Sequence, residues 1–167
     1  AYPNAEDYVL VDRVRGIFKV IPSNETDAET TEPTTVQRFF QRGVQVGSET
    51  NVNRSGDGHV LWQWLLGDSA TTGSTTSPAG SIASTSIVAD AGHFAVISYT
   101  GNATGGATIG HGMSGAPEMI WIKERDNANG FIVGSTIVGF DKILRLDTTD
   151  DEASDAKYTT APGNSCG

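Results

Sequence analysis

Runs of alternating or continuous β-branched residues recur along the chain, and Gly, Asn, Asp and Ser stand between them. Runs of this kind predict short strands bounded by turns. The predicted strands are residues 8–14, 17–21, 36–46, 58–66, 81–88, 93–100, 107–110, 118–124, 130–138 and 141–146. Their close spacing favours antiparallel pairing over βαβ units. We therefore expect an all-β fold, an antiparallel β-sandwich of jelly-roll or concanavalin-like type, with at most a turn or two of helix around 150–156.

The composition supports this expectation and adds that the core is thin. Val and Ile number 24 against 6 Leu, and Thr adds 19 further β-branched residues, which favours strands over helices. Ser, Thr and Gly are abundant, so long polar loops are expected. The large apolar residues predicted to form the structural core are Trp62, Trp64, Phe94, Tyr99, Ile120 and Trp121.

Residues 8–29 match residues 131–152 without a gap, at a constant offset of 123 residues. Gly16 aligns with Gly139, Lys19 with Lys142, and apolar positions align with apolar positions throughout. A match of this kind is typical of repeat proteins. The first interpretation is one repeat of about 123 residues plus part of a neighbouring one. Two similar hairpins within a single sandwich are the alternative.

The domain organisation predicted from this repeat has one boundary. Residues 1–66 are read as the C-terminal part of one repeat unit, and residues 80–167 as the next β-sandwich unit, cut inside the repeat. The segment between them, residues 67–79, is rich in Ser, Thr and Gly and predicts a loop or linker.

Net charge excludes some partners and leaves others open. The 20 acidic and 11 basic residues give a formal charge of −9, which disfavours nucleic acid and anionic bilayers. No apolar run is long enough to insert into a membrane. The lone Cys166 has no cysteine partner within the chain, and it defines neither a compartment nor a metal site.

Two segments are rich in carboxylates, residues 25–32 and residues 147–155, and they occupy equivalent places in the repeat. Hard oxygen ligands suit Ca²⁺, but the spacing of an EF-hand is absent. The residues that could bind calcium are Asp147, Asp150, Asp151 and Glu152. A solvated acidic loop is the favoured interpretation, and otherwise no cofactor is expected.

Exposed tryptophans could stack on sugar rings, so Trp62, Trp64 and Trp121 are also weak candidates for glycan binding. The core assignment given above is the favoured one for all three residues.

The residues do not predict a catalytic site. His111 lies between two glycines, and no strand–loop–helix context for phosphate binding follows it, so a locally packed hairpin residue is expected. Ser114 lacks the sequence of a nucleophile elbow. Glu118 and Glu124 share a predicted strand face, but six residues separate them by about 20 Å, too far for glycoside hydrolysis.

The order of several motifs resembles a repeat domain found in virion proteins of marine and other aquatic tailed bacteriophages. The resemblance covers nearly the whole chain. It rests on Asp12–Gly16, Ser23–Glu29, Gly43–Gly47, Val52–Asp57, Trp62–Trp64, Gly80–Ile82, Phe94–Gly101, Ala107–Gly112, Ala116–Ile120 and Lys142–Leu144. After Trp64 the chain departs from the pattern, because Leu65, Leu66 and Asp68 stand where the family usually has a Lys and a Gly-rich turn.

The resemblance implies a non-enzymatic virion component of a tail or fibre, located on the extracellular particle. Copies of the same protein, as a homo-oligomer, and other virion proteins are the expected partners, and host surface glycan is a further one. The alternatives are a capsid decoration protein, a lectin-like glycan-binding module and a polysaccharide depolymerase. The last alternative requires two carboxylates from different strands about 5–9.5 Å apart.

Overall fold

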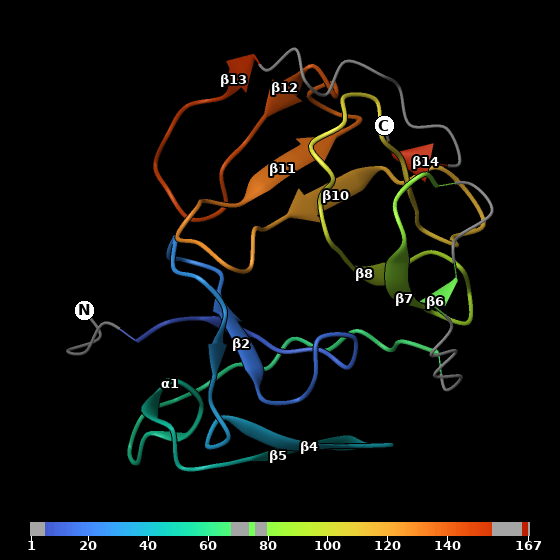
Figure 1. The fold of residues 1–167 in the computed structure, drawn as a ribbon. Helices are drawn as coiled ribbons and strands as arrows, with labels where there is room; N and C mark the ends of the chain where they lie inside the picture. Colours follow the sequence, from blue (N-terminus) through green and yellow to red (C-terminus); the bar gives the residue numbers. More distant parts are fainter. Residues whose placement is uncertain (1–5, 68–73, 76–79, 155–164, 167) are drawn as a thin grey trace. The chain divides into compact units, whose positions relative to one another are not determined.

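The computed structural model describes residues 6–67, 74–75, 80–154 and 165–166. Short antiparallel strands connected by long loops make up this part of the chain, as Figure 1 shows. The all-β, antiparallel fold class is therefore confirmed, while its assignment to the sandwich type stays a prediction. No helix in the described residues is long and apolar enough to span a bilayer.

The strands form small sheets. The strands are β1 (Val9–Leu10), β2 (Lys19–Pro22), β3 (Thr30–Thr31), β4 (Val36–Phe40), β5 (Gly43–Val46), β6 (Ser74–Thr75), β7 (Ser84–Val88), β8 (Ala95–Tyr99), β9 (Ile109–Gly110), β10 (Met119–Ile122), β11 (Ile132–Ser135), β12 (Lys142–Ile143), β13 (Ala153–Ser154) and β14 (Ser165–Cys166). The sheet orders are β1–β2–β3, β4–β5, β6–β7–β8, β10–β11, β12–β13 and β9–β14. The one helix of the described residues, α1 (Thr50–Asn53), starts where the Glu49 carboxylate accepts a hydrogen bond from the Thr50 amide.

The chain divides into two compact units, and it passes between them several times. Unit 1 contains residues 1–62, 121–133 and 144–152, and unit 2 contains residues 63–120, 134–143 and 153–167. The first stretch of unit 1 ends at Trp62, close to the predicted boundary, but later segments return to it.

Each unit has a small apolar centre made by strand residues. In unit 1 the buried residues Val20 and Ile21 come from β2, and Phe131 and Val133 come from the start of β11 and its lead-in. In unit 2, Ile87 is buried on β7, which pairs with β8 over five residues. The predicted thin core is thus present in both units.

The predicted strand at 58–66 does not form, and this overturns the core assignment of Trp62 and Trp64. Residues 58–66 have no strand partner in the described chain. Trp62 and Trp64 are therefore 74% and 56% exposed. The alternation of aromatic and aliphatic residues suggested a strand, but without a paired neighbour most of the segment is exposed, and Leu66 at its end is buried.

The other predicted core residues lie at the edge of the apolar centres. Trp121 and Tyr99 are exposed, and Phe94 and Ile120 are half-buried. Trp121 alternates with half-buried Ile120 and Ile122 along β10, so it points away from the side that is covered. The buried positions are instead occupied by smaller aliphatic residues and Phe131.

Two further local predictions are corrected. The turn of helix expected around 150–156 is not formed in its described part, because residues 153–154 are strand β13 and pair with β12. Within the predicted linker at 67–79, Ser74–Thr75 forms β6 and pairs with β7, so these two residues belong to a sheet. Residues 68–73 and 76–79 of that linker, and 155–156 of the expected helix, lie outside the described residues.

Candidate functional site

The repeat found in the sequence has a structural counterpart: residues 8–31 and 131–154 form the same pattern of strand pairs. We call them the first and second segments. Leu10 pairs with Ile21 in the first segment, and Val133 pairs with Leu144 in the second. Lys19 pairs with Thr31, and Lys142 pairs with Ser154. Every residue of these pairs is related to its counterpart by the offset of 123, so the two segments share one register.

The turns of the two segments also match bond for bond. The Lys19 amide donates to the Gly16 carbonyl at 3.0 Å, and the Lys142 amide donates to the Gly139 carbonyl at 3.2 Å. Both glycines have positive φ, +112° and +89°, a backbone conformation that other residues adopt only with strain. The same turn geometry is therefore maintained by the same residue type in both segments.

Short polar side chains cap equivalent amides. Tyr8 donates its amide hydrogen to Asn24 Oδ1 at 2.8 Å, and Phe131 donates its amide hydrogen to Asp147 Oδ2 at 2.9 Å. A second pair of caps closes the turn before each glycine: Asp12 accepts from the Arg15 amide, and Ser135 accepts from the Val138 amide. The frame common to both segments is thus made by backbone bonds and short caps.

In the first segment a cluster of charged side chains around Glu29 adds to this frame. Glu29 accepts hydrogen bonds from Arg125 Nε and Nη2, both at 2.8 Å, and from Arg15 Nη1 at 3.2 Å. The Glu29 amide also donates to the Arg125 carbonyl at 2.8 Å. Arg15 in turn contacts Asp12. The carboxylate is thus held by two guanidinium groups, one of them from a segment 96 residues away.

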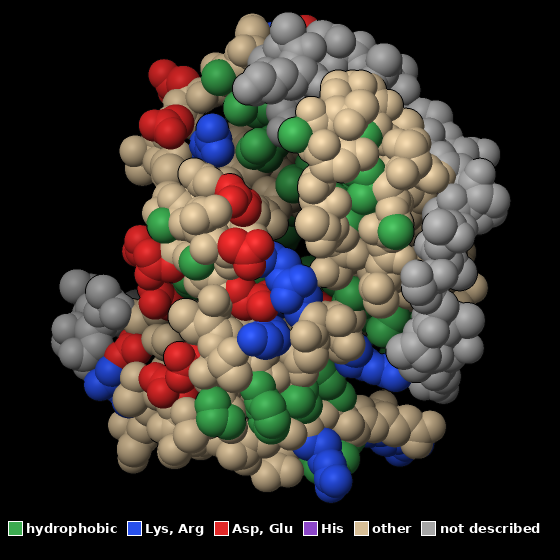
Figure 2. Space-filling model, viewed as in Figure 1, with side chains coloured by type: hydrophobic (Ala, Val, Ile, Leu, Met, Phe, Trp, Pro, Cys, Tyr) green, Lys and Arg blue, Asp and Glu red, His purple; other side chains and the backbone are tan. Residues whose placement is uncertain are grey.

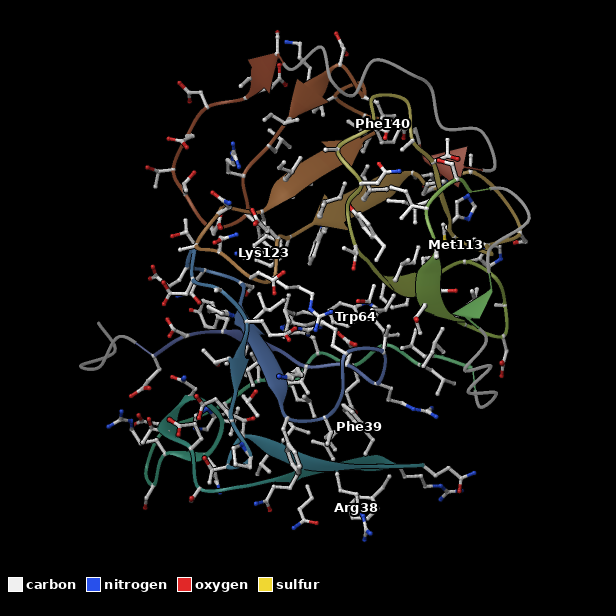
Figure 3. The ribbon with its side chains drawn as sticks, viewed as in Figure 1. Arg38, Phe39, Trp64, Met113, Lys123 and Phe140 are labelled. Atoms are coloured by element: carbon white, nitrogen blue, oxygen red, sulfur yellow. The ribbon has the colours of Figure 1, made fainter. Side chains whose placement is uncertain are left out.

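Lys123 extends this contact to the residues just before Glu29. Its Nζ donates to the carbonyl oxygens of Thr26 at 3.0 Å, Glu124 at 3.2 Å and Asn129 at 2.5 Å. Residues 26–29 form the loop that leads into β3, and we call residues 123–125 the basic loop. Figure 3 labels Lys123, and Figure 2 shows Lys and Arg side chains next to Asp and Glu side chains on the displayed face.

Burial and neighbouring charges shift the pKa values of Glu29, Arg125 and Lys123 in this cluster. Burial alone raises the pKa of Glu29, but the hydrogen bonds and positive charges of Arg125 and Arg15 outweigh it and lower that pKa. The hydrogen bond to Glu29 raises the pKa of Arg125. Burial lowers the pKa of Lys123, against the opposing effect of Asp147, Glu124 and Asp27. The cluster therefore holds fixed charges near neutral pH, as a structural contact does.

A model of a protein family, described as a domain of unknown function, DUF7483, matches residues 2–166. The chain belongs to the DUF7483 family. No curated protein and no solved structure matches it.

The acidic residues considered for calcium lie in the second segment of this DUF7483 domain. Within the described residues, no group of three or more His, Cys, Asp or Glu is placed to hold a metal ion, so these four side chains do not form such a site. Asp147 caps Phe131 with one oxygen, and its Oδ1 is buried without a hydrogen-bond partner. Asp150 accepts a hydrogen bond from the Thr148 hydroxyl at 2.9 Å. Asp151 and Glu152 are exposed.

His111 is buried and hydrogen-bonded locally, as its position between glycines predicts. It is 3% exposed, and its Nδ1 accepts from the Met113 amide at 3.0 Å. An Nδ1 that accepts carries no proton, and among the described residues the buried Nε2 has no hydrogen-bond partner. Ser114 donates its hydroxyl hydrogen to the Gly92 carbonyl. Both side chains are engaged within unit 2.

The tryptophans considered for glycan binding differ in their surroundings. Trp64 stacks against Phe94, with ring centroids 6.0 Å apart and planes inclined by 15°, while more than half of its surface stays exposed. Trp62 and Trp121 are exposed as well, but no ring stacks on either within the described part of the chain.

Sequence analysis missed the charged cluster around Glu29. The matching residues Glu29 and Glu152 were visible in the repeat, but the partners of Glu29 were not. Arg125 lies 96 residues from Glu29, and Arg15 has Val138 at the equivalent position. No spacing rule connects such residues, so only the fold could reveal that they meet.

Proposed function

We propose that the chain is a non-enzymatic structural module of a tailed-phage particle, part of a tail or fibre, which assembles with copies of itself and with other virion proteins. The observation that carries the proposal is the duplicated segment with its constant offset of 123 residues. Structural units that recur at fixed intervals are typical of extended assemblies built by repetition. The phage assignment itself rests on the motif resemblance described above.

The side chains that could perform acid–base or nucleophilic chemistry form contacts within the chain, which agrees with a structural role. Glu29 and Arg125 bind one another, and His111 and Ser114 bond to backbone groups. The Glu124 carboxylate accepts from the side-chain amides of Asn127 and Asn129, and these bonds lower its pKa. Each of these groups is thus engaged in a contact within the chain.

The test is to isolate the particle that contains this sequence and to measure the intact mass of the protein, with peptide mapping. A mass several-fold above 17.5 kDa is the expected result, because a tail or fibre module is one of several in a longer chain. A mass near 17.5 kDa on the particle replaces the tail proposal with capsid decoration. Purified particles without peptides of this sequence contradict the virion role.

A lectin-like module is the second candidate, and the exposure of Trp64 favours it. An indole ring that is fixed by Phe94 on one side and open to solvent elsewhere could stack on a sugar ring. Titration with host-surface polysaccharide, followed by tryptophan fluorescence, tests this candidate. Binding that Trp64→Ala abolishes and Trp121→Ala retains would support it. Binding unchanged in Trp64→Ala would contradict it.

A further inference from the structure

Asn129 and Gly130 are the one Asn–Gly pair of the chain, and they lie in unit 1. In such a pair the backbone nitrogen of the glycine can attack the side-chain carbonyl carbon of the asparagine, because glycine has no Cβ that restricts the approach. The attack closes a succinimide ring and releases ammonia. Asn129 is exposed and Gly130 is half-buried. The groups around this peptide bond therefore determine how fast the pair reacts.

Lys123 contacts the oxygen on which negative charge develops in this reaction. The glycine nitrogen attacks after it has lost its proton, and resonance shares the resulting charge with the carbonyl oxygen of the same peptide bond. That oxygen, the Asn129 carbonyl, accepts a hydrogen bond from Lys123 Nζ at 2.5 Å. A cationic donor at an oxygen that becomes anionic stabilises the charged state. The Lys123 contact therefore favours loss of the Gly130 amide proton.

The Asp147 carboxylate lies against Gly130, where it can accept this proton. Its Oδ2 accepts from the Phe131 amide at 2.9 Å, and a Cβ added to Gly130 would lie 3.1 Å from its Oδ1. Among the described residues, the buried Oδ1 has no hydrogen-bond partner, and the Gly130 amide has no acceptor. A carboxylate oxygen with unused lone pairs next to an unused N–H is suited to act as a general base.

We propose that Asn129–Gly130 is a self-modification site, at which the fold accelerates conversion of Asn129 to aspartate and isoaspartate. Asp147 takes the Gly130 amide proton, and the nitrogen forms a bond to the Asn129 side-chain carbonyl carbon. The bond from this carbon to Nδ2 breaks, and Nδ2 takes up one proton and leaves as ammonia. Water then adds across one of the two ring C–N bonds. The inference goes beyond the proposed function and does not depend on it.

The modification changes the contacts of the loop in which it occurs. A carboxylate replaces the amide that donates to Glu124, so Glu124 loses a hydrogen bond and faces a like charge. Isoaspartate also routes the backbone through the former side chain, at the residue whose carbonyl binds Lys123. Both products therefore weaken the contacts that Glu124 and the basic loop make with residue 129.

The first experiment compares the folded chain with a peptide of residues 121–133, which has the same Asn–Gly pair without the fold. Both are incubated near neutral pH at one temperature, and peptide mapping by mass spectrometry follows aspartate and isoaspartate at Asn129. We expect conversion about tenfold or more faster in the folded chain. An equal or slower rate in the folded chain would overturn the proposal, because the Asn–Gly pair alone would then account for the reaction.

Asn127 is the internal reference for this comparison. It is exposed, and its side-chain amide donates to the same Glu124 carboxylate as that of Asn129, but Ala128 follows it. We expect Asn127 of the folded chain to keep its amide while Asn129 converts. Equal conversion of the two asparagines would contradict the site, because it would indicate a property of the whole loop.

A matched pair of carboxylate variants tests the role of Asp147. Asp147→Asn keeps an oxygen that can accept from the Phe131 amide and removes the base, whereas Asp150→Asn makes the same change at an exposed carboxylate that bonds Thr148. We expect conversion about tenfold or more slower in Asp147→Asn and within about twofold of wild type in Asp150→Asn. Wild-type conversion in folded Asp147→Asn, or equal slowing in both variants, contradicts the assignment. If circular dichroism shows Asp147→Asn to be unfolded, the comparison with the peptide, which uses no variant, decides the proposal.

Discussion

The first and second segments have the same register and turns but differ in the charges placed on them. Asp12 and Arg15 of the first segment correspond to Ser135 and Val138 of the second. The two segments nevertheless keep equivalent strand pairs, amide caps and positive-φ glycines. Backbone pairing and short side-chain caps therefore determine the register and turns that both segments share. The ionic cluster around Glu29 belongs to the first segment and is added to these shared bonds.

The largest expected effect comes from removing a buried residue of the common frame. Val20 and Ile143 are equivalent and both are buried. Truncation to Ala leaves a cavity, so we expect a loss of about 2 kcal/mol for Val20→Ala and about 3 kcal/mol for Ile143→Ala. Urea unfolding followed by circular dichroism measures both losses.

Ile137→Ala is the control for these truncations, because Ile137 is 91% exposed and should be nearly neutral. If only one of the two buried positions proves sensitive, the segments do not contribute equally to stability and the comparison fails.

The next effect distinguishes the two segments. Glu29→Gln breaks a buried ionic contact with Arg15 and a half-exposed one with Arg125, and we expect it to cost about 2 kcal/mol of unfolding free energy. Glu152→Gln, at the equivalent exposed position, should cost less, because exposed charges contribute less to stability than buried ones. Equal losses for the two variants would show that the ionic contacts of Glu29 add nothing to the frame.

Acid should reduce the difference between wild type and Glu29→Gln. Because the folded-state pKa of Glu29 lies below its ordinary value of 4.5, its contribution is fully present above that value and is lost as pH falls through the folded-state pKa. The wild-type chain should therefore lose more stability between pH 6 and pH 3 than the variant does. Urea midpoints at each pH provide the measurement, and parallel curves would contradict the assignment.

The smallest expected effect concerns the glycine turns. Gly16→Ala meets no close atom, since the nearest neighbour of an added Cβ is Lys19 Cγ at 3.9 Å. Its cost is thus conformational, about 1 kcal/mol. Gly139→Ala should cost more, because an added Cβ would lie 2.5 Å from Asp141 Oδ1. The order of the two thermal midpoints checks this, and Gly101→Ala, with open space and no positive φ, is the control.

The sequence allowed prediction of those features that depend on local pattern. β-Branched runs located most strands, and the glycine at 16 and 139 marked both turns. The Trp62 region was predicted wrongly, because alternation alone does not provide a neighbouring strand for pairing. The contacts of Glu29 with Arg125 could not be predicted, since they depend on how loops distant in sequence are brought together.

The caps on the two segments have a consequence for how relatives of this domain can be recognised. Asn24 and Asp147 perform one task with different side chains, and so do Asp12 and Ser135. Homologous domains whose capping residues can be exchanged in this way can lose sequence identity quickly, while the spacing between the turn glycines, the capping residues and the strands stays constant. Searches that score spacing rather than residue identity should therefore detect further members at greater evolutionary distance.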